Sequence, residues 1–142
     1  DEPAAVPVIA QLPIYPVVTL DPDWPSMSQF ADGYLLTAEL IQWFADGHAA
    51  TGADYRTHPL DFDQTAMPPT VLTTASLDPL RDQGVAYVDG LKAAGVHAVH
   101  RSAVGNIHGH ITLRKAIPSS QEDVRGNLKA LKEMLAEVMA HA

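Results

Sequence analysis

The sequence predicts an α/β fold in which parallel strands are flanked by helices. Residues 70–75 (TVLTTA) are β-branched and apolar, as is typical of a buried strand. Asp78-Pro79 then predicts the start of a helix that continues to residue 94. The Asp side chain can accept hydrogen bonds from the unpaired backbone N–H groups of the first turn, and Pro is tolerated at the first helical position. Residues 96–103 (VHAVHRSA) alternate as a second strand. This strand, helix and strand predict a right-handed parallel unit.

A third strand is predicted over residues 8–15, at the edge of the sheet. Pro13 lies inside it, and proline cannot donate a hydrogen bond to a neighbouring strand. We therefore expect a bulge or an unpaired position there. An exposed apolar edge favours pairing with further strands, so we expect this edge to be covered by another part of a larger sheet.

Two helices precede and accompany these strands. We expect a short helical turn at residues 27–30. A longer helix is expected to begin after Thr37, which would cap it, and to end near Gly47. The apolar stripe of that helix consists of Leu40, Ile41, Phe44 and Ala45. Residues 52–69 are predicted to be a loop.

The two later helices have clear boundaries. Gly95 is a good terminator for the helix over residues 80–94, whose predicted buried face consists of Val85, Val88, Leu91 and Lys92. Ser119-Ser120, followed by Glu122 and Asp123, resembles a capping box. The last helix then presents one apolar stripe to the core: Val124, Leu128, Leu131, Leu135, Val138 and Met139.

Composition narrows the possible functions. The chain has 142 residues, 46% hydrophobic and 18% charged, which is typical of a soluble globular domain. Its net charge of −8 argues against binding to nucleic acid or to an anionic membrane. Without cysteine there is no disulfide or thiol nucleophile, and no apolar run is long enough for a membrane span. A cytoplasmic location is the default expectation.

Asp78 and His108 are the candidate functional residues. Asp78 follows a strand directly, where open α/β folds place ligands and catalytic side chains. Gly105 and Gly109 flank His108 in a predicted loop over residues 104–110. Taken separately, Asp78 could be only a helix cap and His108 only a surface residue. A metal site at His108 and His110 is not expected, because no third ligand lies nearby in the sequence.

Three motifs together resemble the hormone-sensitive-lipase family of α/β-hydrolases. They are IYPV at residues 14–17, DPLRDQG at residues 78–84 and IHGH at residues 107–110. The resemblance runs from Val6 to Ala140 but covers only the C-terminal half of the family's domain. It implies that Asp78 is the acid and His108 the base of a catalytic triad, with no cofactor and no metal.

The rest of the triad is not in this chain. No G-x-S-x-G motif and no HGGG-type oxyanion loop occur in it. The resemblance therefore implies a C-terminal portion, completed by a missing N-terminal portion that carries the nucleophilic serine. The chain begins with Asp1, which fits a fragment, and it is expected to be inactive alone. Homo-oligomers are possible.

The implied function is a serine carboxylesterase acting on small-molecule esters with apolar acyl groups. Eight of the nine aromatic residues lie between Tyr15 and Phe62. This clustering is either local core packing or the wall of an apolar pocket. In the resembled family, residues 21–68 correspond to an insertion beside the pocket and the cap. His110 departs from the family's usual Phe, and Gln83 from its usual Glu.

Two alternatives remain open from the sequence. The first is a non-catalytic interaction domain that is derived from an α/β-hydrolase. The second is a freestanding enzyme that uses Asp78 and His108 as an acid/base pair. Ser76 is the serine nearest to an elbow position, but it lacks flanking glycines and directly precedes the Asp78 turn.

Overall fold

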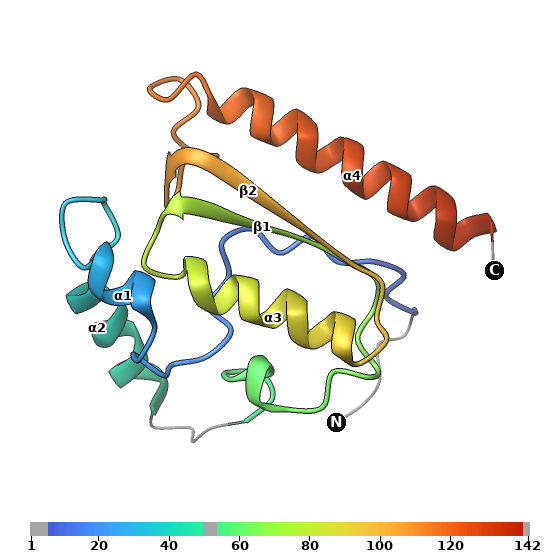
Figure 1. Ribbon diagram of the computed structural model, residues 1–142, viewed down its shortest axis with the longest axis horizontal. Coiled ribbons are helices and arrows are strands. Elements are labelled where there is room, and N and C mark those ends of the chain that lie inside the picture. Colours follow the sequence, from blue (N-terminus) through green and yellow to red (C-terminus); the bar gives the residue numbers. More distant parts are fainter. Residues whose placement is uncertain (1–5, 50–53, 141–142) are drawn as a thin grey trace.

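A two-stranded parallel sheet lies between two helices in the computed structural model, which describes residues 6–49 and 54–140 (Figure 1). Helix α3 (Arg81–Ala93) covers one face of the sheet and helix α4 (Ser120–Ala140) covers the other. The short helix α1 (Pro25–Gln29) and α2 (Ala38–Ala49) lie together near the end of the first strand. No helix in the described ranges is both long and apolar enough to cross a bilayer.

The two strands confirm the predicted parallel unit. β1 (Thr70–Leu77) pairs with β2 (Ala98–Ile107) in continuous register from Thr70 opposite Ala98 to Ala75 opposite Ala103. The predicted end of β2 at residue 103 is wrong. After an irregularity, pairing resumes with Leu77 opposite Ile107, so most of the loop predicted over residues 104–110 is strand. Gly105 allows the irregularity through its φ of 76°.

The predicted strand over residues 8–15 is not a regular strand. This segment runs parallel to β1, but through two isolated bridges only, Gln11 to Thr70 and Ile14 to Thr73. The carbonyl of Pro13 accepts the N–H of Thr73 at 3.0 Å. In this register, a nitrogen at position 13 would face the carbonyl of Val71, and proline has no proton to donate there. Pro13 thus breaks the ladder between the two bridges.

Helix α3 packs on the sheet through the main core. The core consists of Val18, Leu72, Tyr87, Val88, Leu91 and Ala98. Gly84 permits this approach, because a Cβ there would lie 2.8 Å from the methyl group of Thr74. Of the predicted face, Val88 and Leu91 are buried, whereas Lys92 is exposed. Gly95, with a φ of 81°, terminates the helix as predicted.

Helix α4 packs on the sheet through most of the predicted stripe, with Val124, Leu131, Leu135 and Val138 half-buried, but not through Leu128 and Met139. Leu128 and Met139 are 57% and 72% exposed, whereas Asn127 and Met134 are buried. The reason is that the sheet face under α4 is partly polar. The hydroxyl of Thr73 donates to Oδ1 of Asn127 at 2.8 Å, and Nε of Arg101 donates to the same oxygen at 2.9 Å.

The described residues between Asp21 and Thr70 form α1, α2 and a short 3₁₀ helix, η1 (Pro59–Asp61). Thr37 caps α2 as predicted, since its hydroxyl accepts the N–H of Leu40 at 3.1 Å. The helix continues past Gly47 to Ala49. Its apolar stripe is only partly buried, with Ala45 covered but Leu40 and Phe44 exposed. Apart from η1, residues 54–69 form the predicted loop, and residues 52–53 lie outside the described residues.

Candidate active site

Asp78 is the residue that follows β1, and its side chain is fully buried. One carboxylate oxygen, Oδ1, accepts the backbone N–H of Leu80 at 2.9 Å. Leu80 is itself the N-cap of α3, so Asp78 shapes the turn before the helix and does not cap it. The other oxygen, Oδ2, is directed at the second candidate residue.

His108 lies one residue beyond β2, and its Nδ1 is 2.9 Å from Oδ2 of Asp78. The Asp78 side chain is 1% exposed and the His108 side chain 25% exposed. The carboxylate accepts the Nδ1 proton, which leaves Nε2 of a neutral ring with a free lone pair. The pair therefore has the acid-to-imidazole geometry that orients a general base. Gly109, with a φ of 76°, forms the turn after His108.

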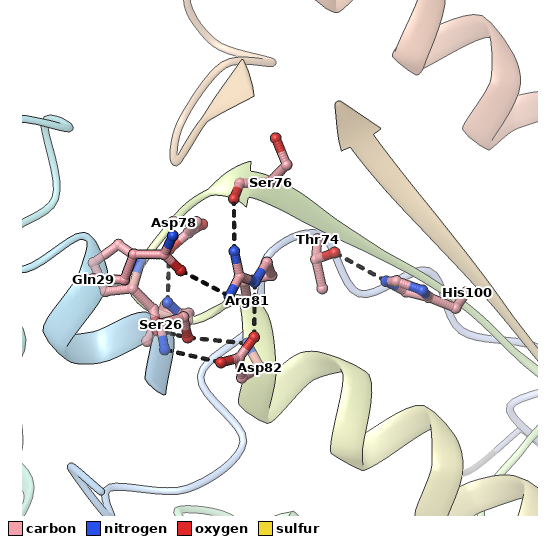
Figure 2. A network of polar contacts seen from close by, with 10 residues as sticks. Ser26, Gln29, Thr74, Ser76, Asp78, Arg81, Asp82 and His100 are labelled. Carbon is pink, nitrogen blue, oxygen red and sulfur yellow. Dashed lines mark hydrogen bonds and ion pairs between the residues drawn. The ribbon is translucent and has the colours of Figure 1, made fainter. Parts of the chain in front are cut away.

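A polar network fixes the turn that carries Asp78 (Figure 2). Ser26, from the start of α1, donates its hydroxyl to the carbonyl of Pro79 at 2.7 Å and accepts the N–H of Asp82 at 3.1 Å. The N–H of Ser26 donates to Oδ2 of Asp82 at 2.8 Å. These three bonds attach α1 to the first turn of α3. The network thereby holds the element that follows Asp78 in place.

Arg81 extends the same network. Its Nε donates to Oδ1 of Asp82 at 2.7 Å, and its other nitrogens donate to the carbonyl of Ser76 and to the side chain of Gln29. The guanidinium also lies 5.1 Å from the ring centre of Phe30. Burial alone would raise the pKa of Asp82. The hydrogen bonds from Arg81 and Ser26, together with the Arg81 charge, outweigh it and lower that pKa.

A pocket of about 320 Å³ borders His108. Its wall is mainly apolar. Most of the wall comes from the segment between the isolated bridges at residues 11 and 14 and the start of β1. The lining residues are Val17, Leu20, Leu36, Ile41, Phe44, Arg56, Thr57, Leu80 and His108. The aromatic cluster noted in the sequence is thus divided: Phe44 lines the pocket, whereas Phe30 is in the core.

Comparison with known proteins gives a consistent answer. Residues 2–112 match the family described as alpha/beta hydrolase fold. The chain belongs to the α/β-hydrolase family. Its resemblance to the hormone-sensitive-lipase group is confirmed, because its relatives are named esterases and lipases.

Two curated relatives illustrate this. Carboxylesterase NlhH of Mycobacterium tuberculosis is 31% identical over 137 residues, which is 91% of this chain and 43% of the relative. Ethyl acetate hydrolase of Pseudomonas putida is 32% identical over 130 residues, which is 88% of this chain and 41% of the relative. This chain therefore spans about two fifths of the length of either relative.

Solved structures agree with this hydrolase assignment. A thermostable esterase from Pseudomonas putida superposes with a TM-score of 0.80 at 31% identity, covering 87% of this chain and 42% of the esterase. A Pyrobaculum calidifontis esterase gives a TM-score of 0.82 at 30% identity, covering 90% and 44%.

Two residues that lie beside the Asp78–His108 pair had no assigned role in the sequence. The ring of Tyr15 lies 4.4 Å from the ring of His108, centre to centre, and 5.5 Å from that of His110. His110 is fully buried, and its Nδ1 is 3.0 Å from the carbonyl of Ile107. Tyr15 is separated from both histidines by more than 90 residues, so no local pattern could indicate the contact.

Two further histidines and Ser76 have partners of their own outside this pair. His97 is exposed and His100 faces Thr74, with Nε2 2.9 Å from the threonine hydroxyl. The hydroxyl of Ser76 accepts the N–H of Gly105 at 2.8 Å. Within residues 6–49 and 54–140, no three acidic or histidine side chains are grouped so as to hold a metal ion.

Proposed function

We propose that this α/β-hydrolase chain is part of a serine carboxylesterase that hydrolyses small-molecule esters with apolar acyl groups. The observation that carries the proposal is the Asp78–His108 pair, joined at 2.9 Å at the border of an apolar pocket. A buried carboxylate on Nδ1 selects the tautomer in which Nε2 can take a proton. The names of the relatives support the same class of reaction.

The reaction needs groups that this chain does not provide. We infer that a serine and the backbone N–H donors of the oxyanion hole come from a portion of the protein outside residues 1–142. Nε2 of His108 takes the serine proton as the serine oxygen attacks the ester carbonyl, and it then protonates the departing alcohol. Water hydrolyses the acyl-enzyme by the same steps. Asp78 stabilises the imidazolium each time it forms.

The pocket wall indicates the class of acyl group. Six of its nine lining residues are apolar, and Leu36, Ile41 and Phe44 come from the segment 21–68. We assign this segment to the wall of the acyl pocket, next to a cap. Burial of an acyl chain there gains about 0.8 kcal/mol per methylene group. The pocket therefore favours short or medium apolar acyl groups over acetyl.

The decisive experiment is labelling of the complete protein with a fluorophosphonate, followed by mass spectrometry under denaturing conditions. We expect the label on a serine outside this chain, and loss of labelling and of ester turnover in His108→Ala. His97→Ala, which changes an exposed histidine, is the control and should keep both. Turnover retained in His108→Ala would overturn the assignment. A complete protein that neither reacts nor turns over esters would instead be a non-catalytic domain.

A further inference from the structure

Tyr15 has a positive φ angle, which is unusual for a residue with a large side chain. Its φ is 39°, a region that bulky residues with a Cβ rarely adopt. Its N–H donates to the carbonyl of Thr73 at 2.6 Å, so the strained residue is anchored to β1. Strain of this kind persists only where the surroundings fix it, and it concentrates at functional sites.

The strained backbone places the Tyr15 ring against His108. The two ring centres are 4.4 Å apart with the planes inclined at 55°, which is direct contact. Asp78 holds one edge of the same imidazole through Nδ1. The imidazole is thus restrained by the hydrogen bond at Nδ1 and by contact with a tilted aromatic ring.

His110 supports Tyr15 from another side. Its ring meets the Tyr15 ring edge-on at 5.5 Å. Nδ1 of His110 is within hydrogen-bonding distance of the carbonyl of Ile107, the residue before His108, and the backbone N–H of His110 donates to that carbonyl at 3.2 Å. His110 therefore connects the turn that carries His108 with the Tyr15 ring that contacts His108.

We propose that Tyr15 is a positioning residue for the base His108, acting through its ring and not through its hydroxyl. This inference rests on the proposed esterase function. The ring fixes the direction of Nε2, and its π electrons lie in contact with the imidazolium that forms during turnover, which allows an attraction of the cation–π type. Burial, and then the charge of Asp78, raise the pKa of the phenol, so Tyr15 stays neutral.

Two substitutions separate the ring from the backbone conformation. Tyr15→Phe keeps the ring and removes only the hydroxyl. Tyr15→Asn removes the ring, yet Asn tolerates positive φ better than most residues, so the chain can keep its path. In the complete protein we expect Tyr15→Phe to retain kcat within about twofold and Tyr15→Asn to lose about tenfold in kcat with KM nearly unchanged.

A geometric readout accompanies the kinetics. The ring current of Tyr15 shifts the Cε1 proton resonance of His108, which can be followed with labelled histidine and assigned by His108→Gln. This shift should persist in Tyr15→Phe and disappear in Tyr15→Asn, whose folding is checked by its thermal midpoint. If Tyr15→Asn does not fold, Tyr15→Gly, which relieves the strain completely, replaces it.

The outcomes distinguish the two proposals. Equal kcat in Tyr15→Asn and the unaltered protein, both active on p-nitrophenyl butyrate, would overturn the role of Tyr15 alone. Equal losses in Tyr15→Phe and Tyr15→Asn would overturn it too, by assigning the effect to the hydroxyl. Absence of turnover in the unaltered protein would overturn the esterase proposal, and the positioning role with it.

Discussion

Gly126 of α4 lies directly against the guanidinium of Arg101 from β2 at the α4–sheet interface. A Cβ at position 126 would overlap the guanidinium of Arg101, whose Nε donates to Asn127. An alanine here would therefore have to displace the end of the Arg101 side chain and disturb its bond to Asn127. Gly126 lies in the interior of a long helix, where glycine is otherwise unfavourable.

Substitution of this glycine should destabilise the protein, against the usual trend. Alanine in place of an exposed helical glycine stabilises by roughly 0.5–1 kcal/mol. Gly47, in α2, has no atom within 4 Å of its hypothetical Cβ, so Gly47→Ala should follow that trend. Gly126→Ala should instead lower the free energy of unfolding by about 1–3 kcal/mol through overpacking. Urea unfolding of both variants tests this, and a stabilised Gly126→Ala would contradict the packing.

Asp78→Asn should abolish most catalysis while largely preserving the fold. The amide can still accept the N–H of Leu80, but it cannot hold His108 in the required tautomer or stabilise its charge. We expect kcat to fall by about 10³–10⁴-fold. Measurement of initial rates on p-nitrophenyl butyrate checks this. Asp89→Asn, which alters an exposed carboxylate on α3, is the control.

Ser26→Ala should cost stability because it leaves two buried groups without their partner. The carbonyl of Pro79 and the N–H of Asp82 both bond to the Ser26 hydroxyl. Each bond contributes about 0.5–1.5 kcal/mol, so a loss of about 1–3 kcal/mol is expected. Ser28→Ala, on the exposed side of the same helix, should leave the unfolding midpoint unchanged. Equal midpoints for the two variants would show that the network is not stabilising.

The acyl pocket should become narrower in Ile41→Trp. Ile41 lines the pocket, so a larger side chain should reduce kcat/KM for octanoate esters at least about tenfold more than for acetate esters. Trp43→Ala, two positions along α2 at a residue that does not line this pocket, should not alter the ratio. A series of p-nitrophenyl esters of increasing acyl length measures the ratio.

His100 should make stability depend on pH. Burial, and then the charge of Lys92, lower its pKa, and Asp89 only partly opposes them. The unfolded chain therefore takes up a proton at a higher pH than the folded chain does. Above the ordinary histidine pKa of about 6.5, His100 does not reduce the free energy of unfolding. The free energy of unfolding decreases as the pH falls through that value, and the decrease is complete below the pKa of His100 in the folded state. His100→Gln should flatten the pH dependence of the thermal midpoint between about pH 7.5 and 5.5.

Much of the fold follows from local sequence. β1 is a buried β-branched run, and its prediction needed only the chemistry of residues 70–75. The end of β2 was missed because Gly105 and Gly109 suggest a loop, whereas pairing with β1 continues across an irregularity to Ile107. The α4 stripe was predicted in its larger part, but buried Asn127 was missed, because the periodicity of apolar residues cannot show that polar Thr73 and Arg101 lie beneath the helix.

The site was predicted in part for a similar reason. Asp78 and His108 belong to short motifs, and the structure brings them together at 2.9 Å. Their catalytic roles remain proposals. Tyr15 and His110 contact the pair only through the folding of distant segments, which no spacing in the sequence encodes.

The attachment of α1 to the turn after Asp78 has a practical consequence for protein engineering. Gln29 of α1 and Phe30, which follows it, hold Arg81 in the same network that fixes this turn, so a library of variants in α1 would disturb the turn next to Asp78. Helix α2 instead presents exposed side chains, among them Leu40 and Phe44. Under the proposed esterase function, directed evolution toward bulkier esters should therefore begin in α2, where changed selectivity can be obtained without disturbing Asp78.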